Sequence, residues 1–368
     1  MRGRVITALS VLALILNLVL ASPAQAQQLD LAPVAIAEPG SPVLLNPGFE
    51  CGDGYHDQPG IHGMVPNGWT ASILAGGDPF MVSTQMWATM SCDPTDMGWE
   101  KIEGHDSNIF MAAYAPYGQD FAAPPFDVVL YQPVSATAGT SYSLSAWMTS
   151  LCGGSTTPSD CPQDAYIAKM AGVDPTGGVD PTAPTVLWIE DRRPHTEVRW
   201  TNLFLATTAQ GPALTVFLRV LSPFYHHGNH VFADAVKLVR APTSHVTVLE
   251  RRGNTIELAW TGELGPDITA ILAGNYRLTF DVQVRSGAAP WQSLLTEQPA
   301  GSHTYVAPQS CFDRTYHFRV RSMAQQVVGQ KGAWPDHHFV GVWVESEPVT
   351  VMHAFTCAHS AHLPLVFR

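Results

Sequence analysis

The feature that most constrains the fold is the lack of helical periodicity beyond the first 26 residues. No later segment repeats its apolar residues with the 3.6-residue period of an amphipathic helix of three or more turns. Short runs rich in β-branched and aromatic residues instead alternate with clusters of Gly, Pro, Asn and Asp. Because parallel α/β folds need helices between their strands, the sequence predicts an all-β chain built of sandwiches.

The strand-like runs fall into two series that meet at Arg240-Ala241-Pro242-Thr243. The first series has runs at residues 108–114, 127–134, 140–149, 185–189, 200–207, 213–221 and 230–239. The second has runs at residues 246–250, 255–260, 276–285, 293–296, 303–306, 315–322, 341–345 and 349–353. About eight strands in about 110 residues is typical of an immunoglobulin-like sandwich. We therefore predict one domain at residues 44–240 and a second at 241–352, with a leader at 27–43 and a tail at 353–368.

The first 26 residues have the pattern of an export signal. Arg2 and Arg4 precede an apolar run, and Ala24-Gln25-Ala26 matches the small-residue pattern of a cleavage site. The alternative is an uncleaved N-terminal anchor. No other apolar stretch approaches the roughly 18 residues that span a bilayer. We expect a secreted protein, free or attached to the cell surface, with no membrane span in the mature chain.

The charge balance argues against one class of partner. The chain has 19 Lys and Arg against 31 Asp and Glu, a formal net charge of −12, and only 14% charged residues beside 46% hydrophobic ones. Loss of the two arginines in the signal would make it more acidic. Nucleic-acid binding needs Lys and Arg against phosphate, so this class is disfavoured.

All six cysteines lie beyond the predicted signal. An even number of cysteines in an exported protein favours disulfides over free thiols. Cys152 and Cys161 bracket a turn-rich loop and are the first predicted pair; Cys51 with Cys92 and Cys311 with Cys357 would then keep each bridge within one domain. Buried free thiols are the alternative.

The second series resembles a fibronectin type III domain over about residues 241–352. Ile256-Glu257-Leu258-Ala259-Trp260 looks like its second strand with a core tryptophan, and Tyr316-His317-Phe318-Arg319-Val320 looks like its sixth. In this resemblance Tyr316 is the tyrosine-corner residue, and Phe318 and Val320 face inward. The usual role of such a domain in exported proteins is spacing or protein contact.

The first series resembles the galactose-binding-like jelly roll of many carbohydrate-binding modules. Leu45-Asn46-Pro47-Gly48-Phe49-Glu50 looks like its opening segment, residues 129–147 like its central hairpin, and residues 231–238 like its closing strand. The resemblance implies a structural calcium between the first and last strands, at Glu50 and Asp234. Acids that cap turns or contact water are the alternative for these positions.

Period-two alternation identifies a candidate ligand-binding group. In residues 140–149, Tyr142, Leu144 and Ala146 share one face, which leaves Trp147 among serines on the other. A sugar needs an aromatic surface and a few fixed hydrogen-bonding groups. We predict that Trp147 forms such a surface with Gln132, Tyr114 and Tyr117; coverage of Trp147 by a loop is the alternative.

We find no catalytic motif: no Gly-x-Ser-x-Gly elbow, no His-Glu-x-x-His and no phosphate-binding glycine loop. The hypothesis is therefore a secreted, non-catalytic protein that binds an extracellular polysaccharide or glycoconjugate. A surface adhesion or spacer protein with protein partners is the main alternative. A glycoside hydrolase with a diverged site, using a carboxylate pair such as Glu190 and Asp191, is the weaker one.

Overall fold

The computed structural model describes residues 42–49, 53–75, 83–85, 111–114, 125–151, 166–193, 200–223, 230–271, 276–326 and 337–352. In these ranges the chain is almost entirely β-strand, with one short helix, α2 (Pro266–Ile271). The all-β prediction is therefore confirmed. The predicted signal and most of the leader and tail lie outside the described residues. Within the described part, no helix has the length and apolar character needed to cross a membrane.

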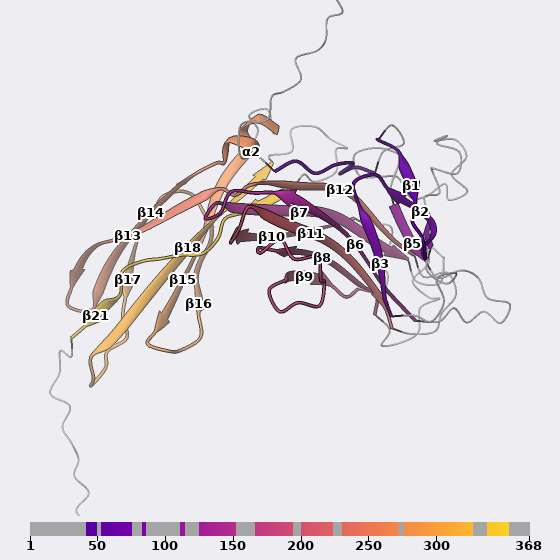
Figure 1. Ribbon diagram of the computed structural model, residues 1–368. Coiled ribbons are helices and arrows are strands. Elements are labelled where there is room, and N and C mark those ends of the chain that lie inside the picture. The colour runs from indigo at the N-terminus through magenta and orange to yellow at the C-terminus, as the bar shows by residue number, and fades with distance from the viewer. Residues whose placement is uncertain are drawn as a thin grey trace, which may run out of the picture. The chain divides into compact units, whose positions relative to one another are not determined.

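The first strand series forms two sheets with one core between them (Figure 1). The seven-stranded sheet has the order β1 (Tyr55–Asp57), β2 (His62–Pro66), β4 (Ser83–Gln85), β5 (Met111–Tyr114), β12 (His230–Arg240), β7 (Ser141–Leu151), β10 (Thr201–Thr208). The five-stranded sheet has the order β3 (Thr70–Ala75), β6 (Phe126–Ser135), β11 (Ala213–Ser222), β8 (Ala168–Asp174), β9 (Leu187–Asp191). We call this the N-terminal sandwich.

Alternation along each strand divides its side chains between core and outside. On β7, Tyr142, Leu144 and Ala146 lie fully buried in the core, as predicted. On β11 the inward positions are 214, 216, 218 and 220, so Phe217 and Arg219 lie on the outward face of the five-stranded sheet. This outward face, which we call the outer face, becomes important for the candidate site.

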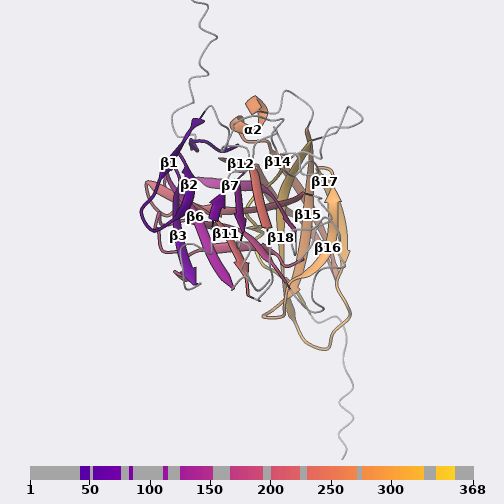
Figure 2. The same ribbon diagram turned by 90° about the vertical axis from the view of Figure 1, so that its right-hand side faces the viewer.

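The second strand series forms the C-terminal sandwich (Figure 2). One sheet is β13 (Thr243–Arg252), β14 (Thr255–Glu263), β17 (Gly301–Val306); the other is β16 (Gln292–Gln298), β15 (Tyr276–Ser286), β18 (Arg314–Gln326), β19 (His338–Val340), with β20 (Val344–Glu345) and β21 (Val349–Val351) also paired to β18. Trp260, Phe318 and Val320 are at most 3% exposed, which confirms their predicted place in the core. Tyr316, the expected tyrosine-corner residue, is 2% exposed.

Residues 337–340 of the second series contact the seven-stranded sheet of the first. The Val340 amide donates a hydrogen bond to Ser143 Oγ at 2.9 Å, and the His338 amide donates one to Asn202 Oδ1 at 3.0 Å. These contacts cover the outward side of β7 and β10, because Ser143 and Trp147 point to the same side of β7.

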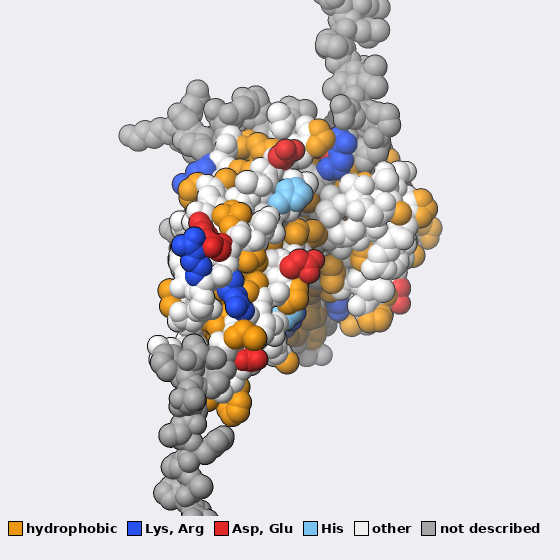
Figure 3. All heavy atoms as spheres, turned by 90° about the vertical axis from the view of Figure 1, so that its left-hand side faces the viewer, with side chains coloured by type: hydrophobic (Ala, Val, Ile, Leu, Met, Phe, Trp, Pro, Cys, Tyr) orange, Lys and Arg blue, Asp and Glu red, His pale blue; other side chains and the backbone are white. Residues whose placement is uncertain are grey.

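The low charge content is visible at the surface. On the face drawn in Figure 3, basic and acidic side chains are sparse and lie among apolar and uncharged polar ones. Two less exposed arginines each bind a carboxylate: Arg219 binds Asp127 at 2.5 Å, and Arg240 binds Asp267 at 2.8 Å. Charged side chains are therefore few on this face, and these two less exposed arginines are paired.

Candidate functional site

The structure places two residues of the predicted ligand-binding group, Trp147 and Gln132, inside the protein. Trp147 is 2% exposed, and its ring meets the His337 ring edge-on at a centroid distance of 6.3 Å. Gln132 is 3% exposed; its Oε1 accepts a hydrogen bond from the Leu45 amide and its Nε2 donates one to the Leu45 carbonyl. The expectation that these two side chains form an exposed surface is therefore corrected. Residues 337–340 cover the side of β7 that carries Trp147, and Gln132 ties residue 45 to β6.

The two tyrosines of that group are placed only in part. Tyr114 is the last residue of β5, where it pairs with His230 on β12 and Ser83 on β4. Tyr117 lies outside the described residues. A ligand-binding role for either tyrosine stays a prediction.

The region of the expected calcium is rich in buried oxygen atoms. Asp234 is fully buried, and its Oδ1 accepts a hydrogen bond from the Ala235 amide. Asn46 is 6% exposed, and its buried Oδ1 has no hydrogen-bond partner among the residues that the structure describes. The Val236 amide bonds the Pro47 carbonyl at 2.8 Å, which brings the two segments together. Asn46 and Ala235 both have positive φ, at 45° and 50°, a strained conformation for residues other than glycine.

This donor set fits a hard cation that prefers oxygen ligands. Asp234 would supply a carboxylate, and Asn46 would supply an amide oxygen to which no described residue donates a hydrogen bond. Glu50, the other expected ligand, lies outside the described residues. Within the described ranges, no three His, Cys, Asp or Glu side chains converge on one point, so any ion here would depend on amide or backbone oxygens as well.

Of the six cysteines, Cys311 is the one in the described part of the chain. It is disulfide-bonded, and it lies between Ser310 and the exposed Phe312 at the end of the C-terminal sandwich. The other five cysteines lie outside the described residues, so all three predicted pairings stay predictions.

A different set of aromatic side chains lies on the outer face of the five-stranded sheet. One row of paired positions crosses four strands: Tyr131 on β6 pairs with Phe217 on β11, Phe217 with Gly172 on β8, and Gly172 with Trp188 on β9. The neighbouring positions of each strand face the core, so this row faces outward. Phe217 is fully buried, whereas Tyr131 and Trp188 are half-buried.

Gly172 allows Trp188 to lie flat against the sheet. A Cβ atom at residue 172 would be only 2.6 Å from the Trp188 ring, so the indole occupies the space that a side chain would fill. The Trp188 and Tyr131 rings lie 5.7 Å and 6.0 Å from the Phe217 ring, by centroid. Two partly accessible rings thus flank one buried ring in a continuous apolar strip.

A charged pair borders this strip. Both Nε and Nη2 of Arg219 donate to the Asp127 carboxylate, at 2.8 Å and 2.5 Å. The hydrogen bonds to Asp127 raise the pKa of Arg219 above its usual range, and the nearby Glu190 carboxylate adds to this. The guanidinium carbon lies 6.0 Å from the Trp188 ring centroid. The ion pair holds the planar guanidinium of Arg219 in one orientation beside the strip. Because Asp127 neutralises Arg219, the pair carries little net charge.

The loop after β8 closes one side of the outer face. Asp174 Oδ1 accepts hydrogen bonds from the amide and hydroxyl of Thr176, and Oδ2 accepts one from the Thr185 hydroxyl. Ala183 and Val186 from this loop pack into the same apolar cluster as Phe217. A short Asp-centred network therefore orders the loop without any regular secondary structure.

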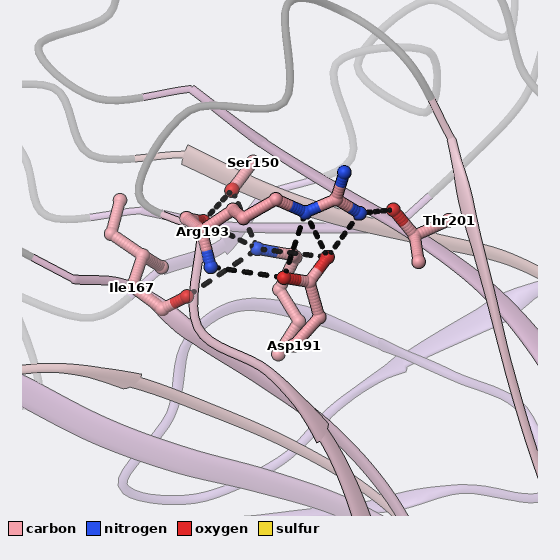
Figure 4. A network of polar contacts seen from close by, with 6 residues as sticks. Ser150, Ile167, Asp191, Arg193 and Thr201 are labelled. Atoms are coloured by element: carbon pink, nitrogen blue, oxygen red, sulfur yellow. Dashed lines mark hydrogen bonds and ion pairs between the residues drawn. The ribbon is translucent and has the colours of Figure 1, made fainter.

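A buried lysine lies on the core side of the same sheet. Its polar partners Ser150, Ile167, Asp191 and Arg193 are labelled in Figure 4. Lys169 on β8 is fully buried; its Nζ donates to Ser150 Oγ at 2.9 Å and to the Arg193 carbonyl at 2.7 Å, and lies 3.8 Å from Asp191 Oδ2. Burial lowers the pKa of Lys169 to about 8, although the Asp191 charge opposes this. Asp191 faces the core side while its neighbour Glu190 faces outward, so these two acids do not act on one substrate.

The sequence predicts strands at 185–189 and 213–221 but does not identify this site. Alternation alone places Phe217 and Arg219 on one side of their strand. The missing information was the strand order, because only the pairing of β6, β11, β8 and β9 brings Tyr131 and Trp188 to the same row.

No protein-family model matches the chain, and no curated protein matches it. Among solved structures, similarity is found to TmCBM61 in complex with beta-1,4-galactotriose, at 17% identity and a TM-score of 0.32 over 53% of this chain and 95% of that one. The K3 cleaved adhesin domain of Lys-gingipain from Porphyromonas gingivalis is 15% identical, with a TM-score of 0.29 over 48% of this chain and 93% of that one. A family 16 carbohydrate-binding module is 13% identical, with a TM-score of 0.22 over 36% and 78%. Similarities this distant assign neither a ligand nor a function to the chain.

Proposed function

We propose that the chain is a non-catalytic protein that binds a polysaccharide or glycoconjugate through the outer face of its N-terminal sandwich. The observation that carries this proposal is the strip in which half-buried Tyr131 and Trp188 flank buried Phe217. A pyranose has an apolar face that stacks on such rings and polar edges that need fixed partners. Next to the strip, Arg219 supplies a donor, and Glu190, which is also paired with Arg192, supplies an acceptor.

The charges at the outer face favour a neutral saccharide. Arg219 is already paired with Asp127 through two hydrogen bonds, so the pair offers direction without net charge. An anionic ligand would have to compete with the Asp127 carboxylate for the same guanidinium. A neutral glycan needs only the guanidinium N–H groups that Asp127 leaves accessible.

The same geometry supports a binding role over hydrolysis. Glycosidases use two carboxylates on either side of the scissile bond. Asp127 is held by Arg219, and Asp191 is directed toward Lys169 on the core side of the sheet. Glu190, the outward carboxylate beside the strip, accepts a hydrogen bond from Arg192 Nε at 2.8 Å, so it too is paired.

The test is a glycan array followed by titration calorimetry on the strongest hit. Trp188→Ala should weaken binding about tenfold, because loss of the stacking surface of an indole ring is expected to cost about 1.4 kcal/mol. The control is Leu187→Ala, since Leu187 is exposed on the same strand but next to the strip and not part of it. Silence of the wild-type chain across all glycans would favour an adhesion or spacer role, and turnover of chromogenic glycosides would favour a hydrolase.

The proposed setting is outside the cell. The disulfide at Cys311 supports an oxidising compartment, in which such bonds persist. The C-terminal sandwich, with its three-stranded sheet beside the sheet centred on β15 and β18, supports the proposal of a fibronectin type III-like domain. Detection of the protein in culture medium or on washed cells would test this placement.

We also propose that calcium is held by Asp234 and Asn46 in the N-terminal sandwich. A cation that binds only the folded chain raises the melting temperature by mass action. Millimolar calcium should therefore raise Tm relative to chelator, and Asn46→Ala should reduce that rise. Equal Tm values with calcium and with chelator would overturn the proposal.

A further inference from the structure

A second group of aromatic and charged side chains lies on the C-terminal sandwich, away from the strip already described. Three arginines and two tryptophans alternate in contact: Arg285, Trp291, Arg319, Trp343 and Arg321. We call them the Arg–Trp row. The guanidinium carbons lie 4.3 Å to 4.8 Å from the ring centroids, well within the range of cation–π contact.

The strand register explains why these side chains meet. Phe280, Val282 and Val284 of β15 and Phe318 and Val320 of β18 are buried, so the positions between them face outward. On that outward side Asp281 pairs with Arg321, and Gln283 pairs with Arg319. Trp291 comes from the connection between β15 and β16, and Trp343 directly precedes β20.

Among the described residues, two of the three arginines form an ion pair with a carboxylate. Arg319 forms none, although its position on β18 pairs with that of Glu345 on β20. Arg321 donates twice to Asp281 Oδ2, at 3.0 Å and 2.9 Å, and Arg285 binds Glu345 Oε2 at 3.3 Å. Arg319 instead donates Nε and Nη2 to the neutral Gln283 Oε1, at 2.9 Å and 2.6 Å. In the described part of the chain, nothing accepts a hydrogen bond from its Nη1.

The surroundings of Arg319 are therefore short of negative charge. Burial lowers the pKa of Arg319, and the like charges of Arg285 and Arg321 lower it further, although Glu345 opposes them. The two rings that contact Arg319 hold its planar guanidinium in place, which leaves little conformational entropy to lose on binding. Such a group is prepared for an oxyanion with matching geometry.

We propose that the Arg–Trp row binds an acidic saccharide chain through a sulfate or carboxylate group on Arg319. A neutral sugar is poorly suited, because each indole already contacts two guanidinium groups that the sugar would have to displace. A polyanion as dense as nucleic acid is also poorly suited, because it depends on many released counterions while this chain carries a net charge of −12. A saccharide with widely spaced acidic groups is better suited, because one such group can bind Arg319 while Arg285 and Arg321 stay paired with their carboxylates.

The proposal is tested by binding of size-matched sulfated, uronate and neutral oligosaccharides to the full chain at low salt. The sulfated and uronate probes should bind, more weakly as salt rises, and the neutral probe should not bind at this row. Arg319→Gln should weaken acidic-probe binding at least about tenfold. Gln283→Glu should do the same while keeping every arginine and tryptophan, because it gives Arg319 the carboxylate that it lacks.

Two control variants show whether a loss of acidic-probe binding is specific to the Arg–Trp row. Arg252→Gln removes an exposed arginine paired to Glu250 on β13, and should leave binding unchanged. Trp188→Ala should also leave acidic-probe binding unchanged, so failure of the neutral-glycan proposal would not affect this one. No binding of either acidic probe, equal loss in Arg252→Gln, full retention in Gln283→Glu, or equal binding of a single-stranded oligonucleotide would each overturn the inference.

Discussion

The two sandwiches place tryptophan and arginine on an outward sheet face in different ways. In the N-terminal sandwich, Trp188 lies on Gly172, and the nearby Arg219 is neutralised by Asp127. In the C-terminal sandwich, Trp291 and Trp343 contact Arg319, whose hydrogen-bond partner is the neutral Gln283. The first face thus combines an aromatic surface with an arginine that a carboxylate neutralises. The second has an arginine that contacts two aromatic rings and has no carboxylate hydrogen-bond partner among the described residues.

The difference follows from the side chain that accepts the hydrogen bonds of each arginine, which is Asp127 for Arg219 and Gln283 for Arg319. The Asp127 hydrogen bonds raise the pKa of Arg219, whereas burial and the charges of Arg285 and Arg321 lower that of Arg319. In our proposals the same pair of residue types binds a neutral ligand on one sheet and an anionic ligand on the other. The proposed ligand class thus depends on the partner of the arginine and not on the presence of the arginine.

The largest expected effect on stability is that of Arg219→Gln. Asp127 is 8% exposed in its side chain, so loss of Arg219 would leave a nearly buried carboxylate without its partner. Breaking such a pair should lower the free energy of unfolding by about 3 kcal/mol. Urea denaturation measures this, and Arg219→Gln combined with Asp127→Asn should recover most of the loss. The control is Arg252→Gln, which breaks an exposed ion pair with Glu250 and should cost less than about 1 kcal/mol. If Arg219→Gln lowered the free energy of unfolding no more than this control, Asp127 would not depend on Arg219 for its stability.

The next effect concerns the glycine beneath Trp188. Gly172→Ala puts a Cβ atom 2.6 Å from the indole, which must move away from Phe217. Overpacking of this kind should cost about 2 kcal/mol and should also weaken saccharide binding. Gly211→Ala is the control, since the nearest atom to its added Cβ lies 3.9 Å away. If Gly172→Ala bound saccharide as well as the wild type, the flat placement of Trp188 would not matter for the outer face.

A buried lysine gives the N-terminal sandwich a pH dependence of its own. The pKa of Lys169 is lowered from 10.5 to about 8 on folding, so the unfolded chain binds more protons between these pH values. Stability should therefore rise with pH through this window, by about 1.4 kcal/mol from pH 7 to pH 9. Below pH 7 both states are protonated and this contribution is constant. Lys169→Met should flatten the rise in urea denaturation series; an unchanged slope would show that other groups cause it.

The sequence was sufficient to predict the architecture but not the sites. Period-two alternation correctly placed Tyr142, Leu144 and Ala146 in the core, and the turn clusters separated most strands. The sequence does not predict β8 as a strand. All seven of its residues are buried, so its apolar and polar residues do not alternate, and the Gly- and Pro-rich segment before it is typical of a loop. Without β8 the outer face could not be assembled.

The candidate sites depend on long-range pairing that local patterns do not encode. Alternation put Trp147 on the correct side of β7, but nothing near it in the sequence indicated that residues 337–340 would cover it. Trp188 and Tyr131 are 57 positions apart and meet only through β8 and β11, while Arg319 meets Trp291 through a different strand pair. Exposure of an aromatic ring is a property of the assembled sheets.

The smallest expected effect completes the comparison. Arg319→Gln removes two cation–π contacts and the hydrogen bonds to Gln283, but it leaves Asp281 paired with Arg321 and Glu345 paired with Arg285. It also removes the repulsion between Arg319 and the other two arginines. The free energy of unfolding should therefore fall by less than about 1 kcal/mol, against about 3 kcal/mol for Arg219→Gln in the same urea series. Equal costs would mean that Arg319 supports its sheet as strongly as Arg219 does, which would contradict the contrast between the two arginines.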